Sequence, residues 1–168
     1  MKILYKYYID NNLHREDGPA VIYKNGTKEY WFNGKKHRIL GPAVEYNDGS
    51  KEYWFNGKLH REDGPAIEYP DGTKIYYIHG NLHREDGPAI YYYTGTFKYY
   101  INGKLHRVDG PAVYESQRKI KYFYINGNLH REDGPAILDN NGKEQYYLFN
   151  KKYCYYDWLK LKKLSILY

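Results

Sequence analysis

The sequence predicts an all-β fold, an elongated, twisted antiparallel meander of about six 23-residue β-hairpin repeats with a capping helix at its C-terminal end. Three observations predict it. The dipeptide His-Arg recurs at a nearly constant interval, each interval holds two short runs rich in Tyr, Ile, Val and Trp, and Asn-Gly or Asp-Gly separates these runs. Self-similarity at a fixed period of about 20 to 50 residues is typical of repeat architectures.

Six His-Arg pairs set the period, and their histidines are His14, His37, His60, His83, His106 and His130. The steps between them are therefore 23, 23, 23, 23 and 24 residues. The chain starts inside a unit, because Tyr7 to Asn11 matches the second half of a copy. We expect residues 1–154 to form one repeat array and residues 155–168 to form the capping helix.

Two glycine-containing turns punctuate each copy. The first is expected to be a type I′ hairpin turn, whose two central residues need positive φ, at Asn25-Gly26, Asp48-Gly49, Asp71-Gly72 and Asn141-Gly142. The second turn ends the copy, at Asn33-Gly34, Asn56-Gly57, Asn102-Gly103 and Asn126-Gly127. It leads into a His-Arg-x-Asp-Gly-Pro connection, which we expect to be a loop or sheet edge because Pro lacks an amide donor. Two strands per copy then give about twelve or thirteen strands.

Equivalent positions in different copies assign faces, since side chains alternate along a strand. In the first strand we expect two buried columns, Val21, Val44, Ile67, Ile90, Val113 and Ile137, and Tyr23, Tyr46, Tyr69 and Tyr92. In the second strand, one face holds Tyr30, Tyr53, Tyr76, Tyr99, Phe123 and Tyr147 with Phe32, Phe55, Ile78, Ile101, Ile125 and Phe149. The opposite face holds the aromatic row, Tyr8, Trp31, Trp54, Tyr77, Tyr100 and Tyr124. We expect the row to be either a solvent-facing binding surface or, if the twisted sheet wraps it, a second core face.

The last fourteen residues change pattern. They contain no Gly or Pro, and Trp158, Leu161, Leu164 and Tyr168 fall at helical spacing. Asp157 is the expected N-cap, and Lys160, Lys162 and Lys163 would line the wet side. Repeat arrays need ends that stop further stacking, so we expect a cap, the alternative being a basic amphipathic helix for a membrane or partner.

Composition limits the class of protein. The net charge of +6 comes from 26 basic and 20 acidic residues that are interspersed, which gives only a weak attraction to anionic surfaces. The single cysteine excludes an internal disulfide framework and a Cys-rich zinc site, and it favours a reducing compartment. No apolar run is long enough for a signal peptide or a membrane span, so we expect a cytoplasmic, intracellular protein without an integral membrane segment.

The His-Arg connections hold the residues that resemble an acid-base or metal site: His14, Arg15, Asp17, His60, Arg61, Asp63, His83, Arg84, Asp86, His106, Arg107, Asp109, His130, Arg131 and Asp133. Repetition argues against catalysis, because an active site needs one tuned, water-excluding pocket. Equivalent histidines would lie about 10 Å apart, too far to share an ion, because each copy adds two strands. We expect no enzyme, metal or cofactor, and a structural loop in which Asp accepts hydrogen bonds from Arg or loop amides. Each Arg would clamp neighbouring copies, except that Arg38, followed by Ile39-Leu40, would be free.

Residues 5 to 152 resemble MORN repeats, a resemblance carried by the period, the Asp-Gly turn, the Tyr-rich second strand and the Gly-Lys-x-His connection, as in Tyr53-Trp54-Phe55-Asn56-Gly57-Lys58-Leu59-His60. The inserted Arg-Glu-Asp-Gly-Pro-Ala departs from the usual pattern and is similar to the MORN-variant repeats of bacteria, phages and large DNA viruses. The resemblance implies an elongated antiparallel sheet and a scaffold for protein assembly, with affinity for anionic phospholipid as a further implication.

These observations favour a non-enzymatic module that binds a protein partner through the aromatic row, because exposed apolar patches usually mark interaction surfaces. Binding of an anionic phospholipid membrane or a single-stranded nucleic acid to a basic, aromatic face is the alternative. Glu29, Glu45, Glu52 and Glu68 beside the row oppose a phosphate backbone. Open sheet edges also leave room for self-association.

Overall fold

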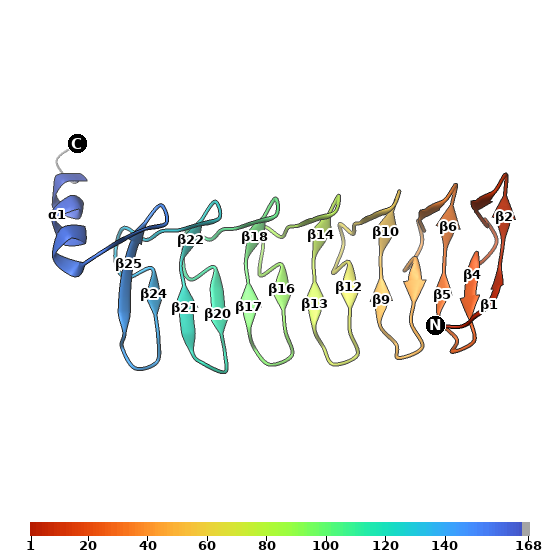
Figure 1. Cartoon of the computed structure of the whole chain (residues 1–168), viewed down its shortest axis with the longest axis horizontal. Helices are drawn as coiled ribbons and strands as arrows, with labels where there is room; N and C mark the ends of the chain where they lie inside the picture. The colour runs from red at the N-terminus through yellow and green to blue at the C-terminus, as the bar shows by residue number, and fades with distance from the viewer. Residues whose placement is uncertain (166–168) are drawn as a thin grey trace. The chain divides into compact units, whose positions relative to one another are not determined.

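The computed structural model describes residues 1–165, and the chain divides into two compact units, Met1–Leu82 and a second that begins at His83. The predicted fold class is confirmed, because both units are antiparallel hairpin meanders and one helix follows at the C-terminal end (Figure 1). Within the described residues there are 26 strands, most of them two residues long.

In each unit a main sheet runs in chain order. In the first unit its strands are β1 (Ile3–Lys6), β4 (Val21–Tyr23), β5 (Lys28–Glu29), β8 (Val44–Glu45), β9 (Lys51–Glu52), β12 (Ile67–Glu68) and β13 (Lys74–Ile75). In the second unit they are β16 (Ile90–Tyr91), β17 (Phe97–Lys98), β20 (Val113–Glu115), β21 (Ile120–Tyr122), β24 (Ile137–Leu138), β25 (Glu144–Leu148) and β26 (Lys151–Tyr153).

A second hairpin in each copy was not predicted. The second Asn-Gly does not simply lead into a loop but joins two more short strands. These pairs are β2 (Tyr8–Ile9) with β3 (Asn12–Leu13), β6 (Trp31–Phe32) with β7 (Lys35–Lys36), β10 (Trp54–Phe55) with β11 (Lys58–Leu59), β14 (Tyr77–Ile78) with β15 (Asn81–Leu82), β18 (Tyr100–Ile101) with β19 (Lys104–Leu105), and β22 (Tyr124–Ile125) with β23 (Asn128–Leu129). We call them the small hairpins, and each follows a strand of the main sheet (Figure 1).

One aromatic residue forms the corner between the main sheet and each small hairpin. Tyr53 donates its amide to the carbonyl of Ala66, just before the next main-sheet strand, at 2.8 Å. Its own carbonyl accepts the amide of His60, at 3.0 Å, at the end of the small hairpin. The same two bonds occur at Tyr7, Tyr30, Tyr99 and Phe123. The corner splits the expected second strand into two pieces because its N–H and C=O serve different hairpins.

The type I′ conformation predicted for the first turn of each copy occurs in the second turn instead. In the small hairpins both central residues have positive φ, for example 50° at Asn56 and 77° at Gly57, as a type I′ turn requires. In the main-sheet hairpins only the glycine has positive φ, for example 90° at Gly49 but not at Asp48, so the predicted type I′ turns are wrong there. The Gly49 amide bonds to Tyr46 O and the Tyr46 amide to Ser50 O, which is a type I turn with a glycine bulge.

The Asn or Asp of the main-sheet turn has a different role from the one predicted. Its side chain accepts the amide two residues later, as in the 2.8 Å bond from Ser50 N to Asp48 Oδ1. This bond lowers the pKa of Asp48, since it favours the carboxylate. In the fifth copy Lys119 takes the positive φ, and the loop between Glu115 and Ile120 is one residue longer, which accounts for the 24-residue step.

The core is a column of small residues. The Ala of each Gly-Pro-Ala is fully buried, at Ala20, Ala43, Ala66, Ala89, Ala112 and Ala136. The predicted Val/Ile column is buried from Val21 to Val113 and half-buried at Ile137. The Tyr column expected beside it is only half-buried, and Tyr69 is exposed, because a single sheet face leaves ring edges in solvent.

After the 24-residue step the period returns to 23 residues, so the last copy aligns one residue earlier than predicted. Arg131 donates its amide to Tyr147 O, as Arg107 does to Tyr124 O, so Tyr147 belongs to the aromatic row. Buried Tyr146 takes the column predicted for Tyr147. Phe149, predicted to share the column of Phe32, instead occupies a turn position with a φ of 50°.

Helix α1 (Tyr155–Ser165) covers the last hairpin through Trp158, whose ring lies 4.8 Å from that of Tyr146 and whose indole donates to Arg131 O. Cys154, not Asp157, caps the helix: its carbonyl accepts the amide of Trp158, its sulfur accepts the amide of Asp157, and its thiol lies 3.1 Å from the Asp157 carboxylate. Tyr168 lies outside the described residues. No helix within residues 1–165 has the length and apolar character needed to span a membrane.

Candidate functional site

Six His-Arg loops each follow a small hairpin in the sequence, and we number them by residue: loop 1 (14–19), loop 2 (37–42), loop 3 (60–65), loop 4 (83–88), loop 5 (106–111) and loop 6 (130–135). In loop 3, Arg61 Nε donates to Asp63 Oδ1 at 2.8 Å, and Nη1 donates to Glu68 Oε1 at 2.7 Å. The same Arg–Asp bond is present in loops 1, 4, 5 and 6. Each loop is therefore closed by its own arginine.

An aromatic ring lies beneath most of these guanidinium groups. Arg61 Cζ lies 3.9 Å from the centroid of Tyr53, the corner residue of the preceding copy. Equivalent contacts join Arg15 to Tyr7, Arg38 to Tyr30, Arg107 to Tyr99 and Arg131 to Phe123. A cation over a ring face is attracted by the ring quadrupole. The arginine side chains thus close their own loops and also contact the copy that precedes them.

The arginine controls the charge state of the loop aspartate. Its hydrogen bond lowers the pKa of Asp17, Asp63, Asp86, Asp109 and Asp133, because it stabilises the carboxylate and not the neutral acid. A general acid at neutral pH needs the opposite shift. The loop aspartates are therefore suited to structure and surface charge.

Arg38 in loop 2 is bonded, whereas we expected it to be free. It donates to Pro42 O at 3.0 Å and to Glu45 Oε1 at 2.7 Å. The glutamate seven residues on takes the place of the missing Asp, and its equivalent in loop 3 is Glu68. Loop 2 therefore keeps its arginine anchor while its tip carries Ile39 and Leu40, which are 78% and 87% exposed.

Each histidine binds the second turn of its own copy. The amide of Asn56 donates to His37 Nδ1 at 3.1 Å, and the same bond runs from residues 33, 79, 102, 126 and 149 to the histidine at the start of the same copy. In the first unit the imidazole rings also stack with side chains of the small hairpins, in the order His14, Phe32, His37, Phe55, His60 and His79. Sequence reasoning missed this stack, although Phe32 and Phe55 recur at the repeat period.

The loops offer no grouped metal ligands. Within the described part of the chain, no three His, Cys, Asp or Glu side chains lie where they could hold an ion together. The nearest carboxylate to His14 Nε2 is that of Glu16, at 3.5 Å, and the corresponding pair in loop 6 is His130 and Glu132, at 3.4 Å. Each pair stands in its own copy.

The aromatic row is half-buried from Trp31 to Tyr124, and only Tyr8 is exposed. In the first unit its indoles are oriented by carboxylates: Trp31 Nε1 donates to Glu29 Oε2 at 2.9 Å, and Trp54 Nε1 donates to Glu52 Oε2 at 2.8 Å. Lys36 Nζ lies 5.8 Å and 5.2 Å from the two ring centroids. The row is thus an ordered, partly exposed surface. It is neither the fully solvent-facing surface nor the buried second core face that we expected as alternatives.

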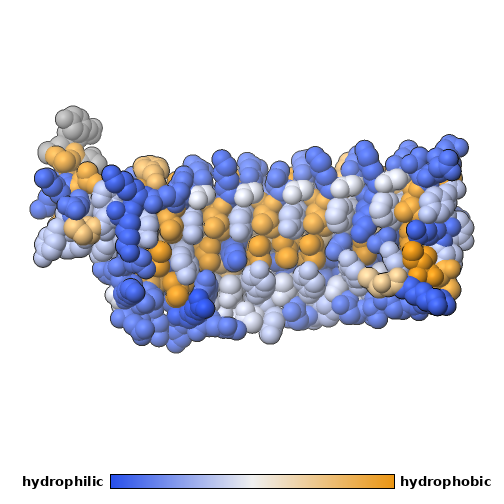
Figure 2. All heavy atoms as spheres, in the orientation of Figure 1, coloured by the Kyte–Doolittle hydropathy of each residue, from blue (hydrophilic) through white to orange (hydrophobic). Residues whose placement is uncertain are grey.

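The same carboxylates hold tyrosines of the main sheet. Tyr46 donates its hydroxyl to Glu52 Oε1 at 2.9 Å, so Glu52 links a tyrosine and an indole. Burial, together with this bond, raises the pKa of Tyr46. Figure 2 shows apolar residues on the visible face as narrow bands separated by polar ones, which agrees with a surface of small repeated patches.

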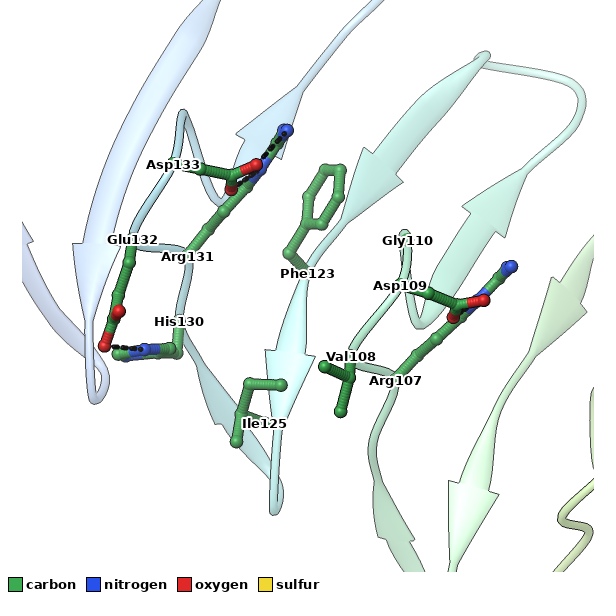
Figure 3. A pocket seen from close by; sticks show the side chains of 10 residues that line it. All are labelled: Arg107, Val108, Asp109, Gly110, Phe123, Ile125, His130, Arg131, Glu132 and Asp133. Atoms are coloured by element: carbon green, nitrogen blue, oxygen red, sulfur yellow. Dashed lines mark hydrogen bonds and ion pairs between the residues drawn. The ribbon is translucent and has the colours of Figure 1, made fainter.

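Open grooves separate neighbouring loops within each unit. Between loops 5 and 6 a groove of about 460 Å³ is lined by Val108, Phe123, Ile125 and the two Arg–Asp pairs (Figure 3). A larger groove of about 770 Å³ lies between loops 1 and 2, with Phe32, Ile39 and Leu40 on its walls. These grooves repeat the same chemistry and none of them concentrates several histidines.

No known protein-family model matches this chain, and no match was found among curated proteins. The likeness to MORN-variant repeats therefore rests on the repeat motif and remains a prediction.

Proposed function

We propose that this chain is a non-enzymatic repeat scaffold of the MORN-variant type that binds a partner protein through its aromatic row. The supporting observation is that the row combines partial exposure with fixed ring orientations, as at Trp31 and Trp54 with their carboxylate acceptors. Rings that are already ordered lose little conformational freedom on binding. Trp and Tyr are also the side chains most often found at the energetic centres of protein interfaces.

A protein partner fits this surface better than an anionic polymer or membrane does. Glu29 and Glu52 lie directly beside the indoles, and the side chain of Glu29 is only 13% exposed. Lys36, beside the indoles, is already paired with Glu29 Oε1 at 3.3 Å, so it offers an external phosphate only part of its charge. A protein partner, in contrast, can place mixed polar and apolar groups along the row.

The repeated loops support a binding role over a catalytic one. Every loop has an arginine bonded to a carboxylate, most have a ring beneath the guanidinium group, and loops 2 and 5 lack one or both acidic residues of the tip. A catalytic constellation needs one enclosed arrangement with pKa values tuned to its task. The single cysteine suits a reducing, intracellular setting.

The test starts with affinity capture from the native host at about 0.5 M salt, where exposed electrostatic contacts are screened. The affinity of the recovered partner is then measured for wild type and for the double variant Trp31→Ala, Trp54→Ala. We expect a loss of at least about tenfold in affinity, the usual scale for removing interface anchors, with the protein still folded by circular dichroism.

The matched control is Tyr69→Ala with Tyr91→Ala, two exposed tyrosines outside the row. It should bind like wild type. Unchanged affinity per folded molecule for the tryptophan variant contradicts the proposal, and so does capture that survives only at low salt together with binding to anionic liposomes or oligonucleotides.

A further inference from the structure

Loop 2 departs from its neighbours at its tip. Loops 1, 3, 4 and 6 carry Glu-Asp where loop 2 carries Ile39-Leu40. Both aliphatic side chains are among the most exposed large hydrophobic residues described, while Arg38 beneath them is bonded to Pro42 O and to Glu45. The tip is therefore a firmly held apolar projection, and such exposure in a soluble fold usually marks a contact surface.

Negative charge flanks this projection. Glu16 of loop 1 lines the same groove as Ile39 and Leu40, and its carboxylate is 78% exposed. Glu62 of loop 3, on the following copy, is 80% exposed. Asp17 and Asp63 are bonded to arginines, whereas Glu16 and Glu62 lie 3.5 Å and 3.7 Å from histidines and stay largely exposed, so these two glutamates are well placed to meet an external cation.

The C-terminal end of the chain has the complementary features. Between the last hairpin and α1 lies a pocket of about 500 Å³, whose walls include Leu148, Phe149, Trp158 and Leu161. Phe149 is 67% exposed although it sits where other copies place Asn. Lys151 and Lys162 lie at this pocket, and Glu132 is the one carboxylate among its lining residues.

We infer that loop 2 of one copy of this chain docks into the C-terminal pocket of a second copy. Ile39 and Leu40 supply the apolar insert, the walls around Phe149 and Leu161 receive it, and Glu16 and Glu62 face Lys151 and Lys162. Opposite charges at the rim steer such an encounter and fix its register. The two surfaces differ, so the contact is heterologous and joins molecules head to tail.

This contact does not involve Trp31 or Trp54, the two residues of the aromatic row that are changed in the partner-binding test. Self-association and partner binding are therefore tested independently, and the double variant Trp31→Ala, Trp54→Ala should leave self-association unchanged. The repeat itself supplies variants that keep the fold, because both surfaces arise where a consensus polar residue has been replaced by an apolar one.

The first variant, Ile39→Glu with Leu40→Asp, restores the loop sequence of copies 1, 3, 4 and 6 and gives Arg38 its usual acceptor. The second, Phe149→Asn, restores the residue found at Asn56 and Asn126, which tolerates the positive φ at this turn. Val108→Glu is the control, since it restores the consensus at another exposed apolar tip, in loop 5.

Sedimentation velocity over a concentration series measures the association. We expect wild type and Val108→Glu to form concentration-dependent oligomers, and the loop 2 and Phe149 variants to associate at least about tenfold more weakly. An equimolar mixture of the two weakened variants should form a heterodimer, because one retains an intact pocket and the other an intact loop 2.

Three outcomes overturn the inference. Wild type could remain a monomer to its solubility limit. Both variants could associate as strongly as wild type, as association through sheet edges would allow. The mixture could also fail to form the heterodimer although wild type associates.

Discussion

Loops 2 and 3 of the first unit have the same arginine anchor but different tips. Arg38 and Arg61 lie 3.8 Å and 3.9 Å above Tyr30 and Tyr53, and each donates to a glutamate seven residues later at 2.7 Å. Loop 3 adds an Arg–Asp pair that loop 2 lacks. The comparison shows that the ring and the glutamate hold the arginine, and that the aspartate is an addition to this anchor.

The glycine of each loop is required for a different reason. In loop 3 a Cβ on Gly64 would lie 3.0 Å from Arg61 Cζ, so a side chain there would push the guanidinium aside by a few tenths of an ångström. In loop 2 the distance is 3.4 Å, but Gly41 has a φ of +116°, which L-residues rarely adopt. Loop 2 therefore reaches the same anchor by a different backbone path.

The largest effect is expected below the loops, at the alanines that both copies bury. Ala43→Ile and Ala66→Ile should each destabilise the fold by about 3 kcal/mol, because added methylenes in a fully packed site force backbone shifts. Chemical denaturation measures both variants. A much smaller loss for Ala43→Ile would mean that the altered path of loop 2 also relaxes the core beneath it.

The next largest effect tests the anchor itself. Arg38→Ala and Arg61→Ala should each cost about 2 kcal/mol, from a lost cation–ring contact and a lost charged hydrogen bond. Similar losses are expected although only Arg61 has an Asp partner. Arg118→Ala, at a side chain that is 75% exposed, should change stability little. If Arg61→Ala is far more damaging than Arg38→Ala, the aspartate is the main anchor.

The repeat period and the turn residues were sufficient to predict the fold class. They were insufficient for the second hairpin, because Asn-Gly is compatible with both kinds of turn and the corner bonds of Tyr53 join residues seven and thirteen apart in sequence. The type I′ conformation was assigned to the wrong turn because Asn-Gly occurs in both kinds of turn. In the main-sheet turns the Asn or Asp is selected as an acceptor for a backbone amide and not for its tolerance of positive φ.

The candidate site was predictable where partners are close in sequence. The pairing of Arg61 with Asp63 follows from a separation of two residues, whereas Glu45 lies seven residues from Arg38 and its role depends on how the hairpin folds back. The contact of His37 with Phe55 was also out of reach, because it joins residues eighteen apart in sequence. Partial burial of the aromatic row depends on Lys36 and on carboxylates whose side chains pack against the rings.

The smallest effect concerns the acidic tips and is seen as a dependence on pH. The folded-state pKa of the loop aspartates is lowered, so their stabilising contribution is present above the unfolded value of about 3.9 and is lost as pH falls through the folded value. The melting temperature of wild type should therefore drop as pH falls below about 4.

Leu40→Asp adds a carboxylate beside Arg38, so it should raise the melting temperature slightly at neutral pH and steepen this acid drop, whereas Asp63→Ala should make the drop shallower. Leu40→Asn is the uncharged control, and an equal gain for Asn and Asp at neutral pH would show that removing the exposed leucine, and not pairing with Arg38, is what stabilises loop 2.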